Sequence, residues 1–153
     1  MENMEIKNKS KTFVINAHKG QVRKSKQEKS KIIHAINVGN ILEEYGFDEN
    51  VISAGYLHDV IEDTNYTIDD IKDHFGEDIF SLIIGASEPD KSLSWETRKQ
   101  HTIKEIKKLD LRHKAVVCAD KISNLEDLLI KFEINGEYNF NALKKDFELK
   151  KWY

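Results

Sequence analysis

Cysteine, proline and long apolar runs are scarce in this chain of 153 residues. Its one cysteine, Cys118, cannot form an internal disulfide, so the fold does not need an oxidising compartment. The longest apolar runs, such as Leu82-Ile83-Ile84, are far shorter than the roughly 20 residues that span a bilayer. The first seven residues lack the apolar stretch of a secretory signal. A cytoplasmic protein without a membrane partner is therefore expected.

With one proline and seven glycines, most of the chain is free to be helical. Apolar residues recur about every 3.6 positions rather than every second position, which predicts an all-α fold. The length suits one domain over residues 1–153, a compact bundle of about six to eight helices. The expected helices cover residues 5–18, 31–44, 49–63, 67–76, 78–86, 95–109 and 111–132.

Acidic and basic residues are unevenly distributed, although the net charge is only −3. Residues 1–31 carry nine Lys and Arg against three acids, whereas residues 43–90 carry fourteen acids against one Lys. A basic arm can meet a polyanion and an acidic segment can hold a cation, so the pattern hints at both. The alternative is that these charges are solvated helix faces.

Three predicted helices place polar side chains on a face that otherwise consists of core residues. In residues 31–45 the inward stripe comprises His34, Val38, Ile41, Leu42 and Tyr45, with Gly46 as the C-terminal glycine. In residues 49–63 it comprises Val51, Ala54, Gly55, His58 and Glu62. In residues 111–132 it comprises Val117, Asp120, Asn124 and Leu128. Cys118, flanked by Val117 and Ala119, is predicted to be a core residue.

Polar residues on buried stripes need compensation, because burying an unpaired charge costs several kcal/mol. In a helix, His58 lies one turn below Glu62 and Asp59 one turn below Asp63, about 6 Å apart in rise. A metal held by the lower layer would have the upper carboxylates beside its bound water or substrate. Metal-assisted hydrolysis needs this order of groups, with ligands first and then an acid or base within reach of the attacking water.

His34 and Asp120 lie on the inward stripes of two other predicted helices, so three helices can converge on one ion. The resulting set has two nitrogen and two oxygen ligands. It suits manganese, iron or magnesium better than the sulfur-rich set of structural zinc, although zinc stays open.

Between about residues 13 and 132 the chain contains, in this order, the motifs Ala17-His18-Lys19-Gly20-Gln21-x-Arg23-Lys24, His34, Leu57-His58-Asp59-Val60-Ile61-Glu62-Asp63-Thr64, Phe75-Gly76, Trp95-x-x-Arg98-Lys99 and Ala119-Asp120-Lys121-x-x-Asn124. This series of motifs resembles the hydrolase part of the RelA/SpoT alarmone enzymes and their small stand-alone relatives, in the HD phosphohydrolase superfamily.

The resemblance implies a fold, a reaction and roles for particular residues. It implies an HD-domain bundle that removes pyrophosphate from the 3′ position of guanosine tetra- or pentaphosphate, (p)ppGpp, to give GDP or GTP. It implies that one divalent cation, usually manganese, is bound by His34, His58, Asp59 and Asp120. It implies that Glu62 and Asp63 activate the water or protonate the leaving group. It also implies that the nucleotide is contacted by Arg23, Lys24 and Asn124.

Two departures from the family pattern leave alternatives open. Residues 25–33 lack the Gly and the Pro-aromatic pair that relatives often have before the first metal histidine, which favours hydrolysis of another nucleotide phosphate or phosphorylated nucleotide cofactor as an alternative. A non-catalytic nucleotide-binding module is a further alternative, and a nucleic-acid partner is not expected. Related small hydrolases continue past a segment like Lys151-Trp152-Tyr153, so the chain is either naturally short or lacks a final helix.

Overall fold

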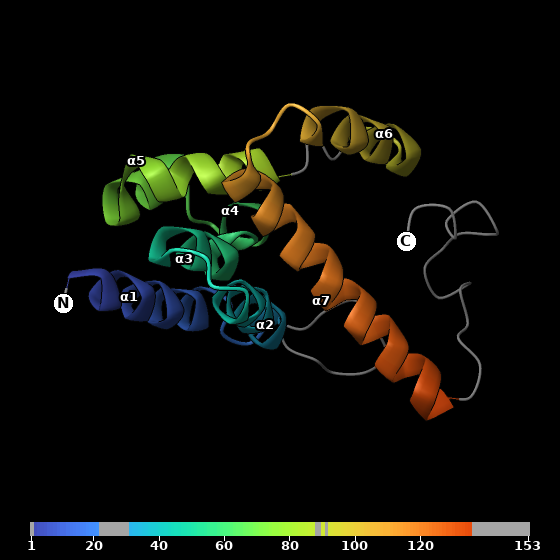
Figure 1. The fold of residues 1–153 in the computed structure, drawn as a ribbon, viewed down its shortest axis with the longest axis horizontal. Coiled ribbons are helices and arrows are strands. Elements are labelled where there is room, and N and C mark those ends of the chain that lie inside the picture. Colours follow the sequence, from blue (N-terminus) through green and yellow to red (C-terminus); the bar gives the residue numbers. More distant parts are fainter. Residues whose placement is uncertain (1, 22–30, 88–89, 91, 136–153) are drawn as a thin grey trace.

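The computed structural model describes residues 2–21, 31–87, 90 and 92–135. These residues form seven α-helices and no strand, which confirms the all-α prediction and the expected number of helices (Figure 1). The helices are α1 (Glu2–Ala17), α2 (Lys31–Glu44), α3 (Glu49–Leu57), α4 (Val60–Asp63), α5 (Ile68–Ala86), α6 (Trp95–Ile106) and α7 (Leu111–Asn135). In the described part of the chain, none of them has the length and apolarity that a membrane crossing requires.

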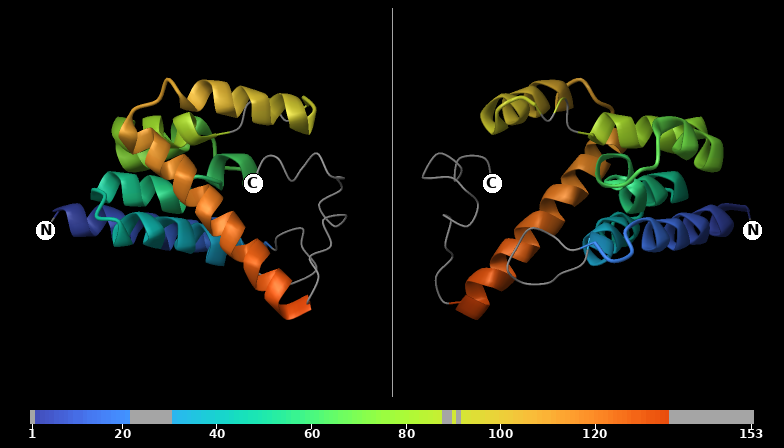
Figure 2. Two further views of the ribbon diagram at one scale, coloured as in Figure 1. Left: turned by 45° about the vertical axis from the view of Figure 1, so that its right-hand side comes forward. Right: turned by 180° about the vertical axis from the view of Figure 1, so that it is seen from behind.

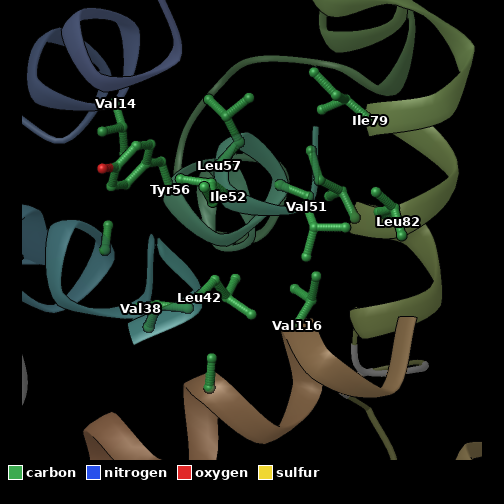
Figure 3. Packing of buried hydrophobic residues seen from close by; sticks show 14 of the residues in the cluster. Val14, Val38, Leu42, Val51, Ile52, Tyr56, Leu57, Ile79, Leu82 and Val116 are labelled. Carbon is green, nitrogen blue, oxygen red and sulfur yellow. The ribbon is translucent and has the colours of Figure 1, made fainter. Parts of the chain in front are cut away.

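Helix α3 lies at the centre of the bundle and packs against α1, α2, α5 and α7 (Figure 1). All of its residues from Val51 to Leu57 are buried. Figure 3 shows the surrounding side chains, which are Val14 from α1, Val38 and Leu42 from α2, Ile79 and Leu82 from α5, and Val116 from α7. Burying each of these side chains stabilises the fold by about 1.5–3 kcal/mol, so the core holds the four neighbours of α3 in place.

Two glycines allow α2 and α3 to cross closely. A Cβ atom on Gly39 would lie 2.1 Å from the ring of Tyr56, and one on Gly55 would lie 3.2 Å from the Cα of Gly39. Backbones can approach this closely only where side chains are missing. The crossing therefore fixes α2 against α3, whose C-terminal end leads into His58.

Several helix ends follow from local sequence. Gly46 has a φ of +76°, as predicted for the residue that ends α2. Thr67 and Asp70 form a capping box at the start of α5. Gly76, with a φ of +86° and a ψ of 173°, interrupts the helical conformation of α5. The element therefore consists of two helical segments that meet at a kink, where the predicted helices over 67–76 and 78–86 adjoin.

Two predicted core residues are exposed. Tyr45 is 72% exposed, because α2 ends at Glu44 and the chain turns away at Gly46 before the stripe can continue. Cys118 is also exposed, although Val117 and Ala119 are buried. Successive residues of a helix are about 100° apart, so burial of both neighbours in sequence does not place a residue inside.

The long helix α7 runs along the bundle from α5 to α2, and α6 lies on the outside (Figure 2). No residue of α6 is buried. The predicted domain boundary at 153 and the alternative of a missing final helix fall on residues 136–153, which lie outside the described residues.

Candidate metal centre

Three helices bring potential metal ligands to one point. His34 comes from α2, His58 follows α3 and Asp120 comes from α7, and these three helices pack against one another. Each of the three side chains offers one ligand atom, and the three atoms lie within 4.8 Å of one another. The two histidines are buried, with ring centroids 5.2 Å apart. Residues that are distant in the sequence therefore share one buried site.

Asp59 joins this group as a second carboxylate. Its Oδ2 atom lies 3.2 Å from Nε2 of His58 and 3.8 Å from Nε2 of His34. Oδ1 of Asp120 lies 3.1 Å from Nε2 of His34 and 3.4 Å from Nε2 of His58. The four side chains that the sequence analysis selected as ligands thus converge, and we call them the ligand cluster.

The chain turns at His58 and Asp59, where a continuous helix over 49–63 was predicted. Nδ1 of His58 donates to the backbone oxygen of Gly55 at 2.8 Å, and α3 ends at Leu57. In a continuing helix, this oxygen would accept from the amide of Asp59. The Asp59 backbone instead has φ −95° and ψ −5°. The prediction of one helix was wrong at this point, because the imidazole competes for a backbone acceptor.

The hydrogen bond to Gly55 also determines the state of His58. A carbonyl oxygen only accepts, so Nδ1 carries a proton, and Nε2 of a neutral ring presents its lone pair. This Nε2 atom is buried without a hydrogen-bond partner, although two carboxylates lie nearby. A lone pair beside two carboxylates is unfavourable unless a proton or a metal cation lies between them. The donor set therefore fits a divalent cation.

The pKa values of three side chains in the ligand cluster also indicate a site for a cation. Burial lowers the pKa of His58, but the carboxylates of Asp59 and Asp120 outweigh it and hold that pKa well above its usual value. Burial raises the pKa of Asp59, but the neighbouring His58 outweighs it and lowers that pKa to about 2. The pKa of Asp120 is also well below its usual range, because both histidines outweigh its burial. The cluster is therefore built for positive charge at its centre, and metal binding would displace a proton from it.

Ser123 and Asn37 support the ligand cluster and were missed by the sequence analysis. Ser123 Oγ is hydrogen-bonded to Nδ1 of His34 at 3.0 Å and accepts from Nδ2 of Asn37 at 2.9 Å. Partners of this kind orient a ligating imidazole. The sequence contained a signal for Ser123, because it lies three residues after Asp120 and hence on the same face of the helix.

Asn124, predicted to contact substrate, is placed beside a potential ligand. Its Nδ2 donates to Oδ1 of Asp120 at 3.1 Å, and Nζ of Lys121 donates to Oδ2 of the same carboxylate at 2.8 Å. Both contacts orient Asp120. A role of Asn124 in nucleotide binding stays a prediction.

The two predicted catalytic carboxylates lie on the one-turn helix that follows Asp59. Glu62 and Asp63 are half-buried, and the carboxylate of Asp63 forms an ion pair with Nζ of Lys31 at 2.8 Å. The ammonium group of Lys31 therefore lies beside Asp63, and the sequence did not indicate this pairing. Arg23 and Lys24, the other predicted substrate contacts, lie outside the described residues.

Comparisons with known proteins agree with this geometry. A family model described as an HD domain matches residues 11–134. The chain is 40% identical over 115 residues to a Drosophila melanogaster protein named guanosine-3′,5′-bis(diphosphate) 3′-pyrophosphohydrolase MESH1, covering 74% of this chain and 64% of that protein. It is 33% identical over 119 residues to a Haemophilus influenzae guanosine-3′,5′-bis(diphosphate) 3′-pyrophosphohydrolase, covering 74% of this chain and 17% of that protein.

Two solved structures resemble the fold. One is described as a metazoan ortholog of SpoT that hydrolyses ppGpp, with a TM-score of 0.75, 36% identity and coverage of 82% of this chain and 71% of that one. The other is a Listeria monocytogenes protein, with a TM-score of 0.72, 40% identity and coverage of 78% of this chain and 77% of that one. The chain spans just under two-thirds of the length of the MESH1 relatives. With a family model that matches most of its length, this chain belongs to the HD domain family.

Proposed function

We propose that this chain is a metal-dependent phosphohydrolase that removes pyrophosphate from the 3′ position of guanosine 3′,5′-bis(diphosphate) or its 5′-triphosphate analogue. The observation that carries the proposal is the convergence of two imidazoles and two carboxylates around the orphaned Nε2 of His58. Relatives named as 3′-pyrophosphohydrolases support the choice of substrate. The proposed setting is the cytoplasm, and the partner is a small nucleotide.

The proposed cation ligands are His34, His58, Asp59 and Asp120, and their mixed nitrogen and oxygen set favours Mn²⁺. When bound, such a cation offsets charge on a phosphate oxygen and lowers the pKa of water from about 15.7 toward 7. The hydrogen bond from His58 Nδ1 to Gly55 keeps Nε2 directed at the cluster. Lys121 and Asn124 donate hydrogen bonds to the carboxylate of Asp120, so this proposed ligand is oriented before the cation and the substrate bind.

Glu62 and Asp63 are the proposed proton-transfer groups. One of them takes a proton as water attacks the phosphorus atom that is joined to the ribose 3′ oxygen. The bond from phosphorus to that oxygen breaks, pyrophosphate leaves and the ribose oxygen receives a proton. Arg23 and Lys24 would offset substrate charge, and Asn124 would contact the nucleotide.

The test is release of pyrophosphate and GDP from ppGpp by the purified protein with added Mn²⁺. Wild-type protein and an Asp78→Asn control should be active, and an Asp120→Asn variant should be inactive. Absence of turnover across a panel of alarmones would contradict the proposed substrate.

A second candidate is hydrolysis of another nucleotide phosphate or a phosphorylated nucleotide cofactor. It is favoured by the departure of residues 25–33 from the family pattern, and by Lys31 in particular, whose ammonium group lies at Asp63. Turnover of such compounds without turnover of alarmones would select this candidate. Tight alarmone binding by metal-loaded protein without cleavage would instead indicate a non-catalytic binding module.

A further inference from the structure

Asp63 is held at three separate points. Its carboxylate accepts from Nζ of Lys31 at 2.8 Å, and its backbone oxygen accepts from Nε2 of Gln21 at 2.8 Å. Its backbone amide donates to the oxygen of Asp59 at 3.0 Å. The last residue of α4 is thus tied to the segment after α1, to the first residue of α2 and to the turn that carries a candidate ligand.

Gln21 is itself fixed by its other polar groups. Because the Asp63 carbonyl only accepts, the amide nitrogen of Gln21 must face it, and Oε1 faces Nδ1 of His18 at 2.8 Å. His18 is fully buried, and it donates to Gln21 from this nitrogen. The backbone of Gln21 bonds to that of His18 at 2.9 Å and accepts from the amide of Lys31 at 3.3 Å. Glutamine supplies both the donor to Asp63 and the acceptor for His18, whereas glutamate would lack the donor.

Helix α4 needs such external support. It has four residues, no side-chain hydrogen bond at its N-cap, and Val60 as its buried residue. An isolated helix of one turn does not persist in water, because nucleation costs more than one turn of hydrogen bonds returns. Contacts from outside α4 therefore set where Glu62 and Asp63 lie.

One of the two supports, Lys31, comes from a helix that also carries a member of the ligand cluster. Lys31 lies three residues before His34 on α2, so both side chains belong to the same face of that helix. The side chains of Lys31 and Asp63 are 25% and 23% exposed, so water screens their interaction only in part. A shift of α2 relative to α4 would change both the cation site and this ion pair.

We propose that Gln21 and Lys31 are positioning residues, which hold Asp63 by its carbonyl and its carboxylate and thereby set the proton-transfer helix α4 against the ligand cluster. His18 acts through Gln21. This inference rests on the proposed function for the roles of Glu62 and Asp63, whereas the anchoring of α4 is independent of it.

The experiment compares four single variants of the full chain. Lys31→Met removes the ion pair, Lys31→Arg restores a cation, and Gln21→Glu keeps the size and the acceptor for His18 but removes the donor to Asp63. The matched control is Lys7→Met, which removes the ion pair of Lys7 with Glu43 between α1 and α2. Lys7 is 20% exposed, close to the value for Lys31, and it is not placed in the site.

The first measurement is amide hydrogen exchange of Asp63 and Thr64, whose amides donate to Asp59 and Val60 within α4 and the turn before it. Exchange should accelerate by about tenfold or more in Lys31→Met and Gln21→Glu, because local opening of α4 becomes easier. It should return toward the wild-type rate in Lys31→Arg and stay unchanged in Lys7→Met.

The second measurement is steady-state kinetics with Mn²⁺ and the nucleotide. Misplacement of a catalytic group by about 1 Å costs up to about 100-fold in rate, so kcat should fall by about 10- to 100-fold in Lys31→Met and Gln21→Glu. KM should change by less than about threefold, because these residues act through Asp63 rather than by binding uniformly to the substrate. Lys31→Arg should recover most of kcat, and Lys7→Met should lose none.

Unchanged exchange in both anchor variants would overturn the proposal. Faster exchange with unchanged kcat would also overturn it, because the contacts would then be structural only. An equal loss of kcat in Lys7→Met would overturn it by removing specificity. If the wild-type protein hydrolyses no nucleotide, the proposed function fails. The anchoring is then judged by exchange alone, where faster rates support it and unchanged rates overturn it.

Discussion

Two polar clusters join distant elements of this protein, and they differ in completeness. In the Arg112 cluster, the guanidinium of Arg112 on α7 binds the carboxylates of Asp48 and Asp78, each through two nitrogen–oxygen contacts of 2.6–3.1 Å. In the ligand cluster, the Nε2 atom of His58 is buried beside two carboxylates without a hydrogen-bond partner. The Arg112 cluster is satisfied by protein atoms, whereas the ligand cluster leaves this one buried nitrogen without a hydrogen-bond partner.

The difference teaches how a structural cluster can be told from a binding site. The side chains of the Arg112 cluster are 37–53% exposed. Each of its two carboxylates accepts two hydrogen bonds from the planar guanidinium of Arg112. The histidines of the ligand cluster are almost fully buried, where an unmatched polar atom is costly. A buried imidazole nitrogen without a hydrogen-bond partner, placed beside two carboxylates, is the arrangement expected of a site for a cation.

The largest expected effect is that of Asp120→Asn, which would break the ligand cluster. Loss of one charged ligand should weaken Mn²⁺ binding by more than about 100-fold, since even supporting residues of metal sites account for 10- to 100-fold. Thermal unfolding with and without Mn²⁺ measures this. Bound metal at 100 times its dissociation constant stabilises the fold by about 2.7 kcal/mol, and this gain should vanish. Asp78→Asn, from the Arg112 cluster, should retain the gain; an Asp120→Asn variant that retained it would refute the assignment.

A smaller effect is expected for Ser123→Ala, which removes the partner of His34 Nδ1 but leaves every proposed ligand in place. Mn²⁺ affinity should fall by about 10- to 100-fold, measured by calorimetric titration. Ser10→Ala is the control, because Ser10 is equally buried but bonds to a carbonyl of its own helix. Equal affinities of Ser123→Ala and the control would show that His34 needs no such partner.

Gly39→Ala tests the packing between α2, which carries His34, and α3, which leads into His58. The new Cβ would lie 2.1 Å from the ring of Tyr56, and overpacking of this kind lowers the free energy of unfolding by about 1–3 kcal/mol. Urea denaturation measures the loss. Adding Tyr56→Leu removes the ring that the Cβ meets, so the double variant should lose less than the sum of the single losses. Strict additivity would mean that the ring is not the obstacle.

The smallest effect is expected for Arg112→Met, which breaks the self-satisfied cluster. Its side chains are more than a third exposed, so solvent screening limits the loss of unfolding free energy to about 1 kcal/mol. Arg112 lowers the pKa of Asp78 to about 2 in the folded state, and the usual value is 3.8. The stabilisation is therefore present above about pH 4 and is lost as the pH falls toward 2.

Urea denaturation of wild type and Arg112→Met at several pH values measures this trend, and the difference between the two should shrink as the pH falls through this window. Lys108→Met, which removes an exposed pair with Glu105, is the control and should change stability by less than about 0.5 kcal/mol. A difference that grew on acidification would contradict the stated direction of the pKa shift.

Much of the fold was predictable because local rules decided it. The stripe of His34, Val38, Ile41 and Leu42 is buried as its spacing indicates, and Gly46 ends its helix with a positive φ. Tyr45 and Cys118 were misplaced, because periodicity gives a direction on a helix but not the extent of the surface that neighbouring elements cover. The turn at His58 was missed because a side-chain bond to Gly55 overrides helical propensity.

The sequence by itself determined the helical class and the stripes of α2 and α7 that carry His34 and Asp120, from which we predicted a cation shared with His58 and Asp59. Only the tertiary structure decided that these four side chains converge. It alone also decided what supports them: Ser123 behind His34, and Gln21 and Lys31 on Asp63. Helical period links residues three or four apart. Contacts between residues 42 or 89 positions apart depend on how the helices pack, and no local pattern encodes that packing.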